Sequence, residues 1–200
     1  MVKNIIFDLS EVIISGYHGT EKVVAQNTDL SAEEFLARKT EVTDFFLDTM
    51  RGKHSEDEYC AHLLEGTGWN LSIQKVKECV RQNLNVPVEG TLEIVKRLKG
   101  KYRLILLSDH VREWAEYILE NNSELEIFDQ LYFTYEYGLL KADEGCFEHV
   151  LKDLASKPEE IIFIDDYFVN IDRAKECGIE AILFKNAKDL EQELEKRGIL

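Results

Sequence analysis

The stretch from Lys3 to Ile14, KNIIFDLSEVII, predicts a short buried strand that ends at an acid and then turns. The apolar run before Asp8 is typical of a strand inside a sheet, and the polar residues after it are typical of a turn. Asp8 therefore stands at the end of a strand, and Ser10 follows two residues later. The chemistry of this strand end depends on the side chains that the other strands bring to it.

The composition favours a single globular unit. The 200 residues, 44% of them hydrophobic, suffice for one core or for a core with a smaller insertion. No apolar run approaches the roughly 20 residues that cross a bilayer, and the N-terminus lacks the pattern of a signal peptide. The four cysteines are scattered and form no Cys-x-x-Cys pair, which suits a reducing compartment. We therefore expect a cytoplasmic protein.

The formal net charge of −15 bears on the partners of the chain. A strongly acidic protein repels nucleic acid and anionic membranes, and no basic stripe offsets that charge here. We expect neither as a partner. An anionic substrate then needs a locally positive site, supplied by a metal ion, a lysine or backbone N–H groups.

Short apolar runs alternate with helical patterns after the first third of the chain. The strands are predicted at Asn4–Phe7, Arg103–Leu107, Gln130–Thr134, Ile161–Ile164 and Ala181–Phe184. The helical patterns between them cover Glu89–Leu98, Val111–Glu120, Gly145–Ala155 and Ile171–Cys177. This alternation predicts an α/β fold, a three-layer doubly wound parallel sheet with helices on both faces.

Residues 15–84 have a different pattern, with no convincing strand. Two stretches have the form of a capping box at a helix start, SAEE from Ser31 and SEDE from Ser55. We interpret this segment as a helical-bundle cap inserted after the first strand. The predicted α/β core then consists of residues 1–14 and 85–200.

The predicted strands end in polar residues that should meet at one edge of the sheet. Parallel strands point the same way, so their carboxyl ends share an edge, where open α/β sheets bind ligands. The residues in question are Asp8, Ser108 with Asp109, Lys141 in the loop after the third strand, and Asp165 with Asp166 and Asn170 after the fourth. Taken alone, each of these residues could be an ordinary turn or surface residue. Their occurrence together, each at a strand end, is poorly explained by coincidence.

This set suits phosphoryl transfer through an aspartyl-phosphate. The Asp8 carboxylate can attack phosphorus and divide one hard step into two easier ones. Mg²⁺ prefers oxygen ligands, and Asp8, Asp166 and the backbone carbonyl of Ser10 would supply them. Ser108 and Lys141 would hold the transferring group. Of the five histidines, only His110 follows a strand end, and we expect it at a helix start or on the surface.

Four stretches make the chain resemble the haloacid dehalogenase-like (HAD) hydrolases. They are IIFDLSEVII with Asp8 as the nucleophile, LILLSD with Ser108, GLLKADEGCFEHVL with Lys141, and IIFIDDYFVNIDRAKECGI with the acidic pair. The inserted helical segment matches the family's cap in position and size. The resemblance is strongest to helical-cap phosphatases near the sugar-phosphate phosphatases and the phosphatase domain of soluble epoxide hydrolase. It implies a Mg²⁺-dependent phosphatase that acts on a small phosphorylated metabolite.

The chain departs from the family pattern at three places, and Ser10 is the serious one. Most family phosphatases have an aspartate there that protonates the leaving oxygen and then activates water. Loss of such acid–base help costs on the order of 10²–10⁴ in rate, unless water, Glu11 or a cap residue substitutes. Ala142 replaces a common proline after Lys141, and Tyr167 with Phe168 adds aromatic bulk after the acidic pair.

Two other functions remain open, and one is excluded. A catalytically weak phosphate-binding or partner-binding protein on the same fold is supported by Ser10 alone. A dehalogenase also lacks the second aspartate, but that branch does not keep an acidic pair such as Asp165 and Asp166. A signalling receiver domain places its acidic pair after the first strand, which is the reverse of the order here.

Overall fold

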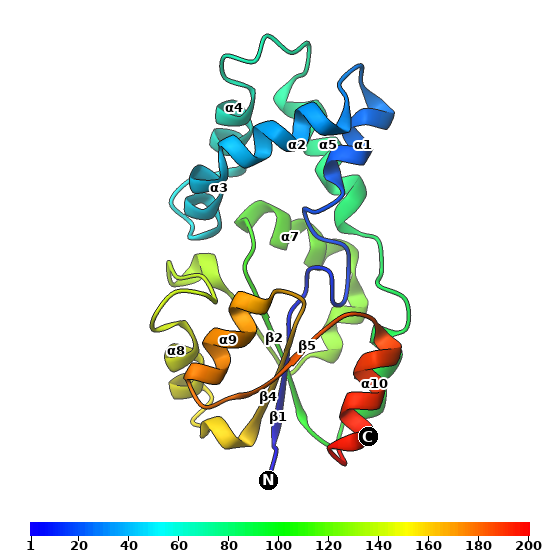
Figure 1. Cartoon of the computed structure of the whole chain (residues 1–200), viewed down its shortest axis with the longest axis vertical. Helices are drawn as coiled ribbons and strands as arrows, with labels where there is room; N and C mark the ends of the chain where they lie inside the picture. The colour runs from blue at the N-terminus through cyan, green and yellow to red at the C-terminus, as the bar shows by residue number, and fades with distance from the viewer.

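A computed structural model describes all 200 residues and contains one five-stranded, all-parallel sheet (Figure 1). The strand order is β3-β2-β1-β4-β5, so the first strand is central. The strands are β1 Asn4–Phe7, β2 Arg103–Ser108, β3 Gln130–Phe133, β4 Ile161–Asp165 and β5 Glu180–Leu183. Every strand lies within one residue of its predicted bounds. Because β1 is flanked by β2 and β4, the residue that follows it has neighbours on both sides.

Helices cover both faces of the sheet. On one face Ile5 and Phe7 of β1 belong to the hydrophobic cluster that contains α6 Thr91–Leu98, α7 Arg112–Asn121 and α10 Ala187–Lys196. On the other face Ile6 packs with α8 Cys146–Asp153 and α9 Phe168–Glu176. Alternation of side chains along a strand explains this division. The predicted three-layer doubly wound α/β fold is confirmed.

The connections contain three short 3₁₀ helices and several glycine caps. The 3₁₀ helices are η1 Ser123–Ile127, η2 Thr134–Glu136 and η3 Pro158–Glu160. Gly100, Gly178 and Gly198 follow helices with φ of 82°, 78° and 66°, the left-handed conformation that glycine adopts without strain. Helix α9 begins at Phe168, three residues earlier than predicted, because the Asp165 side chain accepts the Tyr167 N–H just before the first turn.

Five helices separate β1 from α6 and stand above the carboxyl edge of the sheet (Figure 1). They are α1 Thr20–Asn27, α2 Ala32–Glu41, α3 Thr43–Met50, α4 Glu56–Leu64 and α5 Ile73–Leu84. The predicted capping boxes at Ser31 and Ser55 are both present. The division into a core of residues 1–14 and 85–200 and a cap of residues 15–84 stays a prediction, because one hydrophobic cluster runs from the sheet into these helices.

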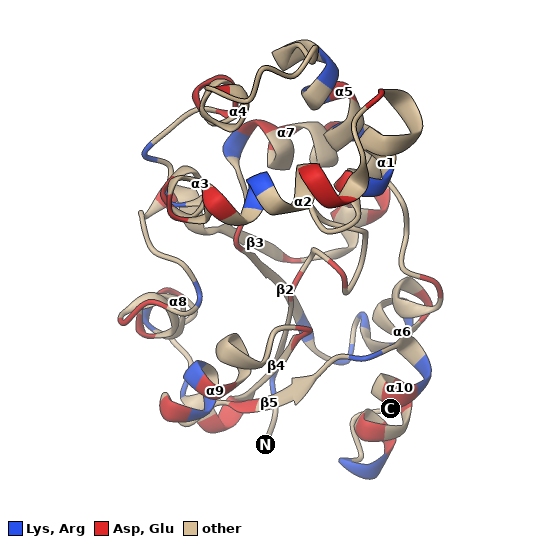
Figure 2. Cartoon of the chain, turned by 45° about the horizontal axis from the view of Figure 1, so that its top comes forward, with Lys and Arg blue, Asp and Glu red and all other residues tan.

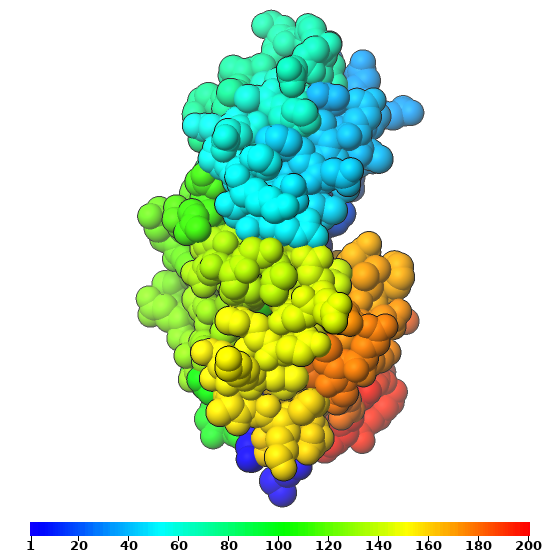
Figure 3. Space-filling view, turned by 90° about the vertical axis from the view of Figure 1, so that its left-hand side faces the viewer, coloured from blue at the N-terminus to red at the C-terminus, as the bar shows by residue number.

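Polar contacts join the helical segment to the rest of the chain. Arg51, which follows α3, donates from Nε and Nη2 to the two carboxylate oxygens of Asp143, both at 2.9 Å. Glu56 at the start of α4 is buried and accepts the Trp114 indole N–H at 2.6 Å. The space-filling view shows residues near 50 resting on those near 140 (Figure 3). Both contacts hold the helical segment over the sheet edge.

Charged residues are distributed over helices of both parts of the molecule. Acidic and basic positions alternate on the outer helices, including α2, α8, α9 and α10 (Figure 2). None of the helices combines the length and the apolar character that crossing a membrane requires. Leu190 and Leu194 of the C-terminal helix α10 are buried.

The close contact between Gly52 and the backbone of Tyr135 allows a test of how the helical segment packs on the rest of the chain. Gly52 has φ of 78°, and a Cβ there would lie 2.7 Å from the Tyr135 carbonyl oxygen. Gly66, with φ of 71°, has no neighbour within 4 Å of such an atom. Gly66→Ala should lower the free energy of unfolding by about 1–2 kcal/mol through backbone strain alone. Gly52→Ala should cost about 1–3 kcal/mol more, because the methyl group also meets the backbone of η2. Urea unfolding of both variants measures the difference, and equal losses would contradict the contact.

Candidate active site

The ends of β1 and β4 and the loop after η2 bring three charged side chains into contact. The ammonium nitrogen of Lys141 lies 2.8 Å from Asp8 Oδ1 and 2.6 Å from Asp165 Oδ2. All three residues are buried, with Lys141 only 2% exposed. The predicted convergence of these residues at one edge of the sheet is therefore observed.

Asp165 is held on every side by the chain. Its oxygens accept the Tyr167 backbone N–H at 2.7 Å and the Asn170 side-chain amide at 3.1 and 3.2 Å, in addition to Lys141. A carboxylate with this many donors has a fixed orientation. Asp165 and Asn170 therefore position Lys141 and the loop that follows β4.

Asp8 differs from Asp165 because one of its oxygens is free. Oδ1 accepts the Leu9 N–H at 2.7 Å and contacts Lys141, whereas Oδ2 makes no hydrogen bond within the chain. Burial raises the pKa of Asp8 well above its usual value; Lys141 opposes this rise, and Asp165 adds to it. Lys141 thus orients the carboxylate and leaves Oδ2 available to react.

Lys141 remains a cation in this setting. Burial alone lowers its pKa, but the nearby carboxylates, first Asp165 and then Asp8, outweigh burial and raise the pKa above the ordinary lysine value. Asp109 contributes a backbone contact, since its Oδ1 accepts the Lys141 N–H at 3.0 Å. Asp109 therefore fixes the loop that carries the ammonium group.

The acidic pair after β4 completes a cluster of oxygen donors. Asp8, Asp165 and Asp166 each offer a carboxylate oxygen, and these atoms lie within 4.8 Å of one another. Asp166 is the least buried of the three, and burial together with Asp165 raises its pKa. Three clustered carboxylates exceed the single ammonium of Lys141 in charge, so the donor set fits a hard divalent cation such as Mg²⁺.

Ser108 ends the strand beside β1 and is completely buried. Its Oγ has no hydrogen-bond partner within the chain. A buried hydroxyl without a partner is uncommon, because the unmade hydrogen bond costs free energy. Ser108 is thus a polar group at the sheet edge that is able to bind a ligand.

The turn after Asp8 places Ser10 beside Glu11 and Gly16. Glu11 adopts the left-handed conformation, with φ of 59°, and its Oε1 accepts the Gly16 N–H at 2.7 Å. The Ser10 side chain lies against Gly16, where a Cβ would be 2.7 Å from the Ser10 Cβ. The Ser10 carbonyl accepts no hydrogen bond, since those of Leu9 and Ile14 serve this turn. The Glu11 carboxylate is therefore held within the turn, and position 10 offers only a hydroxyl and a free carbonyl.

Two sets of residues near this edge were not predicted. His110 is expected at a helix start or on the surface; it stands two residues before α7, as the first alternative has it, but it is buried and not on the surface. A cavity of about 380 Å³ is lined by Tyr17, Lys39, Phe46 and other residues of the helical segment, and by Tyr167 from the loop after β4. The aromatic residue that departs from the family pattern thus reaches the helices. Helical periodicity does not reveal which side chains of a bundle face such a cavity.

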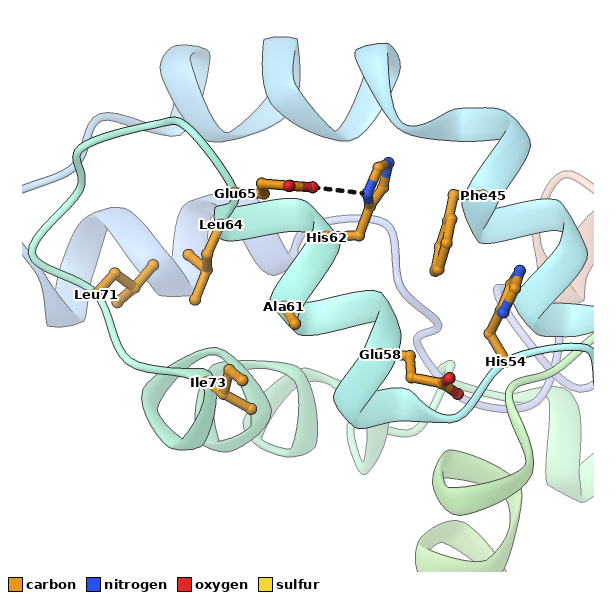
Figure 4. Close-up of a pocket in the computed structure, with 9 residues that line it drawn as sticks. All are labelled: Phe45, His54, Glu58, Ala61, His62, Leu64, Glu65, Leu71 and Ile73. Atoms are coloured by element: carbon orange, nitrogen blue, oxygen red, sulfur yellow. Dashed lines mark ion pairs between the residues drawn. The ribbon is translucent and has the colours of Figure 1, made fainter.

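A larger hollow, of about 820 Å³, lies within the helical segment and contains none of the predicted site residues (Figure 4). Its wall includes a stack in which Phe45 lies between the rings of His54 and His62, at centroid distances of 4.1 and 4.3 Å. All of its lining residues come from positions 45–73. We therefore place the reactive chemistry at the sheet edge and not in this hollow.

A buried acid–lysine–acid cluster lies at the carboxyl edge of a doubly wound sheet, and this set of groups suits a hydrolase. The family model of the haloacid dehalogenase-like hydrolases matches residues 2–178, and the chain belongs to this family. The resemblance seen in the four sequence stretches is thereby confirmed.

Several known proteins are similar over all or part of the chain. A D-ribitol-5-phosphate phosphatase of Bacteroides thetaiotaomicron is 30% identical over 202 residues, which cover 97% of each protein. The bifunctional epoxide hydrolase 2 of Rattus norvegicus is 33% identical over 69 residues, 34% of this chain and 12% of that enzyme. A HAD family enzyme of Bacteroides thetaiotaomicron, solved with magnesium and inorganic phosphate, has a TM-score of 0.75 at 24% identity, covering 93% of this chain and 96% of that one. This last likeness supports the fold.

The raised pKa of Asp8 predicts how this residue affects stability. The folded chain holds the Asp8 proton more tightly than the unfolded chain, so ionisation of Asp8 opposes folding. Stability of the wild type should therefore fall as pH rises above the unfolded value of about 3.9, through the window that ends at the raised pKa. Asp8→Asn carries no charge and should lack this fall, so at pH 7 in EDTA it should be more stable than the wild type. Urea unfolding between pH 4 and 8 measures the stability of the wild type and of the variant. If Asp8→Asn were less stable than the wild type at pH 7, the raised pKa of Asp8 would be contradicted.

Proposed function

We propose that the protein is a Mg²⁺-dependent phosphomonoester hydrolase that acts on a small phosphorylated metabolite through an aspartyl-phosphate on Asp8. The observation that carries this proposal is the free Oδ2 of a buried Asp8 whose other oxygen is held by Lys141. The 30% identity to a D-ribitol-5-phosphate phosphatase supports a sugar-phosphate or polyol-phosphate substrate. The strong negative charge argues against nucleic acid and membranes as partners, and the proposed location is the cytoplasm.

In the first step, Asp8 Oδ2 forms a bond to phosphorus while the bond from phosphorus to the leaving oxygen breaks. The Lys141 ammonium and the Ser108 hydroxyl donate hydrogen bonds to the non-bridging phosphate oxygens, where negative charge is concentrated. The leaving oxygen takes its proton from water, because Ser10 has no carboxyl proton to give. Alcohols that are stable as anions leave most easily under these conditions.

In the second step, water attacks phosphorus and the Asp8 carboxylate is released. The water must lose a proton; Ser10 supplies no carboxylate to accept it, and the Glu11 carboxylate is tied to the Gly16 N–H through Oε1. Hydrolysis of the aspartyl-phosphate is therefore the slow step for substrates with good leaving groups. The missing acid–base group at position 10 is what distinguishes this chain from most phosphatases of its family.

The metal would be held by the Asp8 and Asp166 carboxylates and by the Ser10 carbonyl. When bound, Mg²⁺ supplies positive charge that offsets the repulsion between the carboxylates and the phosphate. The lower exposure of Asp165 and the four hydrogen bonds that it accepts from three donor groups suit a supporting role, in which it orients Lys141. Serine at position 10 keeps the backbone carbonyl, so the substitution leaves this ligand in place.

The first test of the proposal is phosphate release from p-nitrophenyl phosphate and a panel of sugar phosphates. Activity should require Mg²⁺ and should disappear in EDTA. Asp8→Asn should lower kcat by at least about 10³-fold, because the nucleophile is lost. Asp172→Asn, which removes an exposed acid of α9, is the matched control and should leave kcat unchanged. Activity that survives Asp8→Asn or EDTA would refute the mechanism.

The role of position 10 is tested by restoring the missing acid. Ser10→Asp should raise kcat for alkyl phosphates on the order of 10²-fold or more, because it supplies the general acid and base. The gain should be smaller for aryl phosphates, whose leaving group needs no proton. The wild type should accordingly prefer aryl, acyl or anomeric phosphates in an assay limited by chemistry. Equal turnover of alkyl and aryl phosphates by the wild type would show that position 10 is not limiting.

A second candidate function is a phosphate-binding or partner-binding protein that is catalytically weak, and Ser10 is the observation that favours it. Under this alternative neither the wild type nor Ser10→Asp releases phosphate from any substrate. Inorganic phosphate would still bind in the presence of Mg²⁺, because Lys141 and Ser108 are retained. The same panel of assays thus separates the two functions.

A further inference from the structure

The cavity of about 380 Å³ between the helical segment and the loop after β4 has a mainly apolar wall. Six of its ten lining residues are hydrophobic, and four of these are aromatic: Tyr17, Phe46, Tyr59 and Tyr167. Small-molecule sites in proteins are typically apolar cavities of about 300–1,000 Å³ with a few polar groups. The size and the lining of this cavity therefore suit a small organic ligand.

The wall of the cavity continues directly from residues of the candidate active site. Tyr167 follows Asp166 in the chain, and Asp166 is a proposed metal ligand. Tyr17 follows Gly16, where a Cβ would lie 2.7 Å from the Ser10 Cβ. Two segments that are distant in sequence thus lead from the proposed metal ligands Ser10 and Asp166 into the same cavity. A substrate whose phosphate lies at the sheet edge has this cavity beside it.

Solvent reaches the wall of the cavity. Leu36 of α2 and Tyr167 both line it, and they are 48% and 53% exposed. Large apolar side chains that are exposed together beside a hollow are typical of a ligand-binding surface. A molecule from solvent is therefore able to contact the side chains that would bind it.

The main polar groups of the wall are already bound within the chain. The hydroxyl groups of Tyr17 and Tyr59 hydrogen-bond each other at 2.8 Å. Lys39 is paired with Glu21 at 3.1 Å, and its ammonium nitrogen lies 3.9 Å from the centroid of the Tyr17 ring. These groups have little capacity left for a second phosphate or for several hydroxyl groups. The exposed ring of Tyr167, by contrast, is able to pack against another ring, an arrangement that aromatic groups favour.

We propose that this cavity binds an aromatic ring on the alcohol part of the substrate, and that Tyr167 determines this specificity. The inference rests on the proposed phosphatase function and narrows its substrates to phosphate esters whose alcohol carries such a ring. A sugar or polyol can stand between the ring and the phosphate. Tyr167 touches no reacting atom in this account, because it binds the end of the substrate away from phosphorus.

The test uses two inhibitors of p-nitrophenyl phosphate hydrolysis that differ only in a ring. Phenylpropylphosphonate and propylphosphonate have the same phosphonate group, and neither has an ester bond to hydrolyse. With Mg²⁺ present, the ring should lower the inhibition constant of the wild type by about 10–100-fold, which is the value of burying a ring in an apolar site. Tyr167→Ala should lower this preference by about 3–10-fold, the value of one aromatic contact. The inhibition constant of propylphosphonate should change by less than about twofold.

Two further variants separate binding in the cavity from other effects. Tyr167→Phe keeps the ring and should keep the preference. Phe168→Ala is the matched control, because Phe168 is 61% exposed and packs on Tyr167 at 5.3 Å but does not line the cavity. It should also keep the preference within about twofold. All three variants change exposed side chains and leave the backbone hydrogen bond from Tyr167 to Asp165 in place, so each should fold.

The outcomes distinguish this inference from the proposed function. The inference would be overturned by a wild type that binds both phosphonates equally. It would also be overturned if Tyr167→Ala kept the preference for the ring, or if Phe168→Ala lowered it as much as Tyr167→Ala does. In each of these cases, hydrolysis of p-nitrophenyl phosphate would still uphold the phosphatase. A wild type that hydrolyses no phosphate ester would overturn the proposed function and this inference with it.

Discussion

The structure depends on one buried ammonium group placed between two carboxylates. Lys141 joins the end of β1 to the end of β4 through Asp8 and Asp165, and each of these acids would be unstable in the interior without it. Removing Lys141 would leave both carboxylates buried without a counter-charge, and the loss of one partner in this way typically costs about 3–5 kcal/mol. This is several times the value of an exposed pair, which is about 0–1 kcal/mol. The interaction therefore fixes the sheet edge and orients the proposed nucleophile at the same time.

The two acids that flank Lys141 differ in whether a carboxylate oxygen remains without a hydrogen bond. Asp165 has donors on both oxygens, so it has little capacity left for chemistry. Asp8 keeps Oδ2 free, and the orphaned hydroxyl of Ser108 lies at the end of the next strand. Asp165 thus holds the lysine, and Asp8 is the carboxylate that is able to react. The helical segment, joined to the core through Arg51 and Glu56, stands above this edge of the sheet (Figure 1).

Much of this arrangement could be predicted from the sequence, because strand ends are marked locally. An apolar run followed by an acid locates Asp8 and the acidic pair, and parallel strands necessarily bring such ends together. The orientation of His110 could not be predicted in this way, because burial depends on the packing of Trp114, a residue on the following helix. The contact of Arg51 with Asp143 spans 92 positions and has no local signal. The cavity beside Tyr167 is also formed by residues distant in sequence.

The measurement that tests the central claim most directly is a rapid-quench time course with p-nitrophenyl phosphate and Mg²⁺. Nitrophenolate leaves without a proton, so the first step should be fast, and the absence of a free base should make the second step slow. The account predicts a burst of about one nitrophenolate per active site, with phosphate bound covalently to Asp8, before steady phosphate release. Nitrophenolate and phosphate that appear together from the start, with no phosphate on the protein, would contradict it.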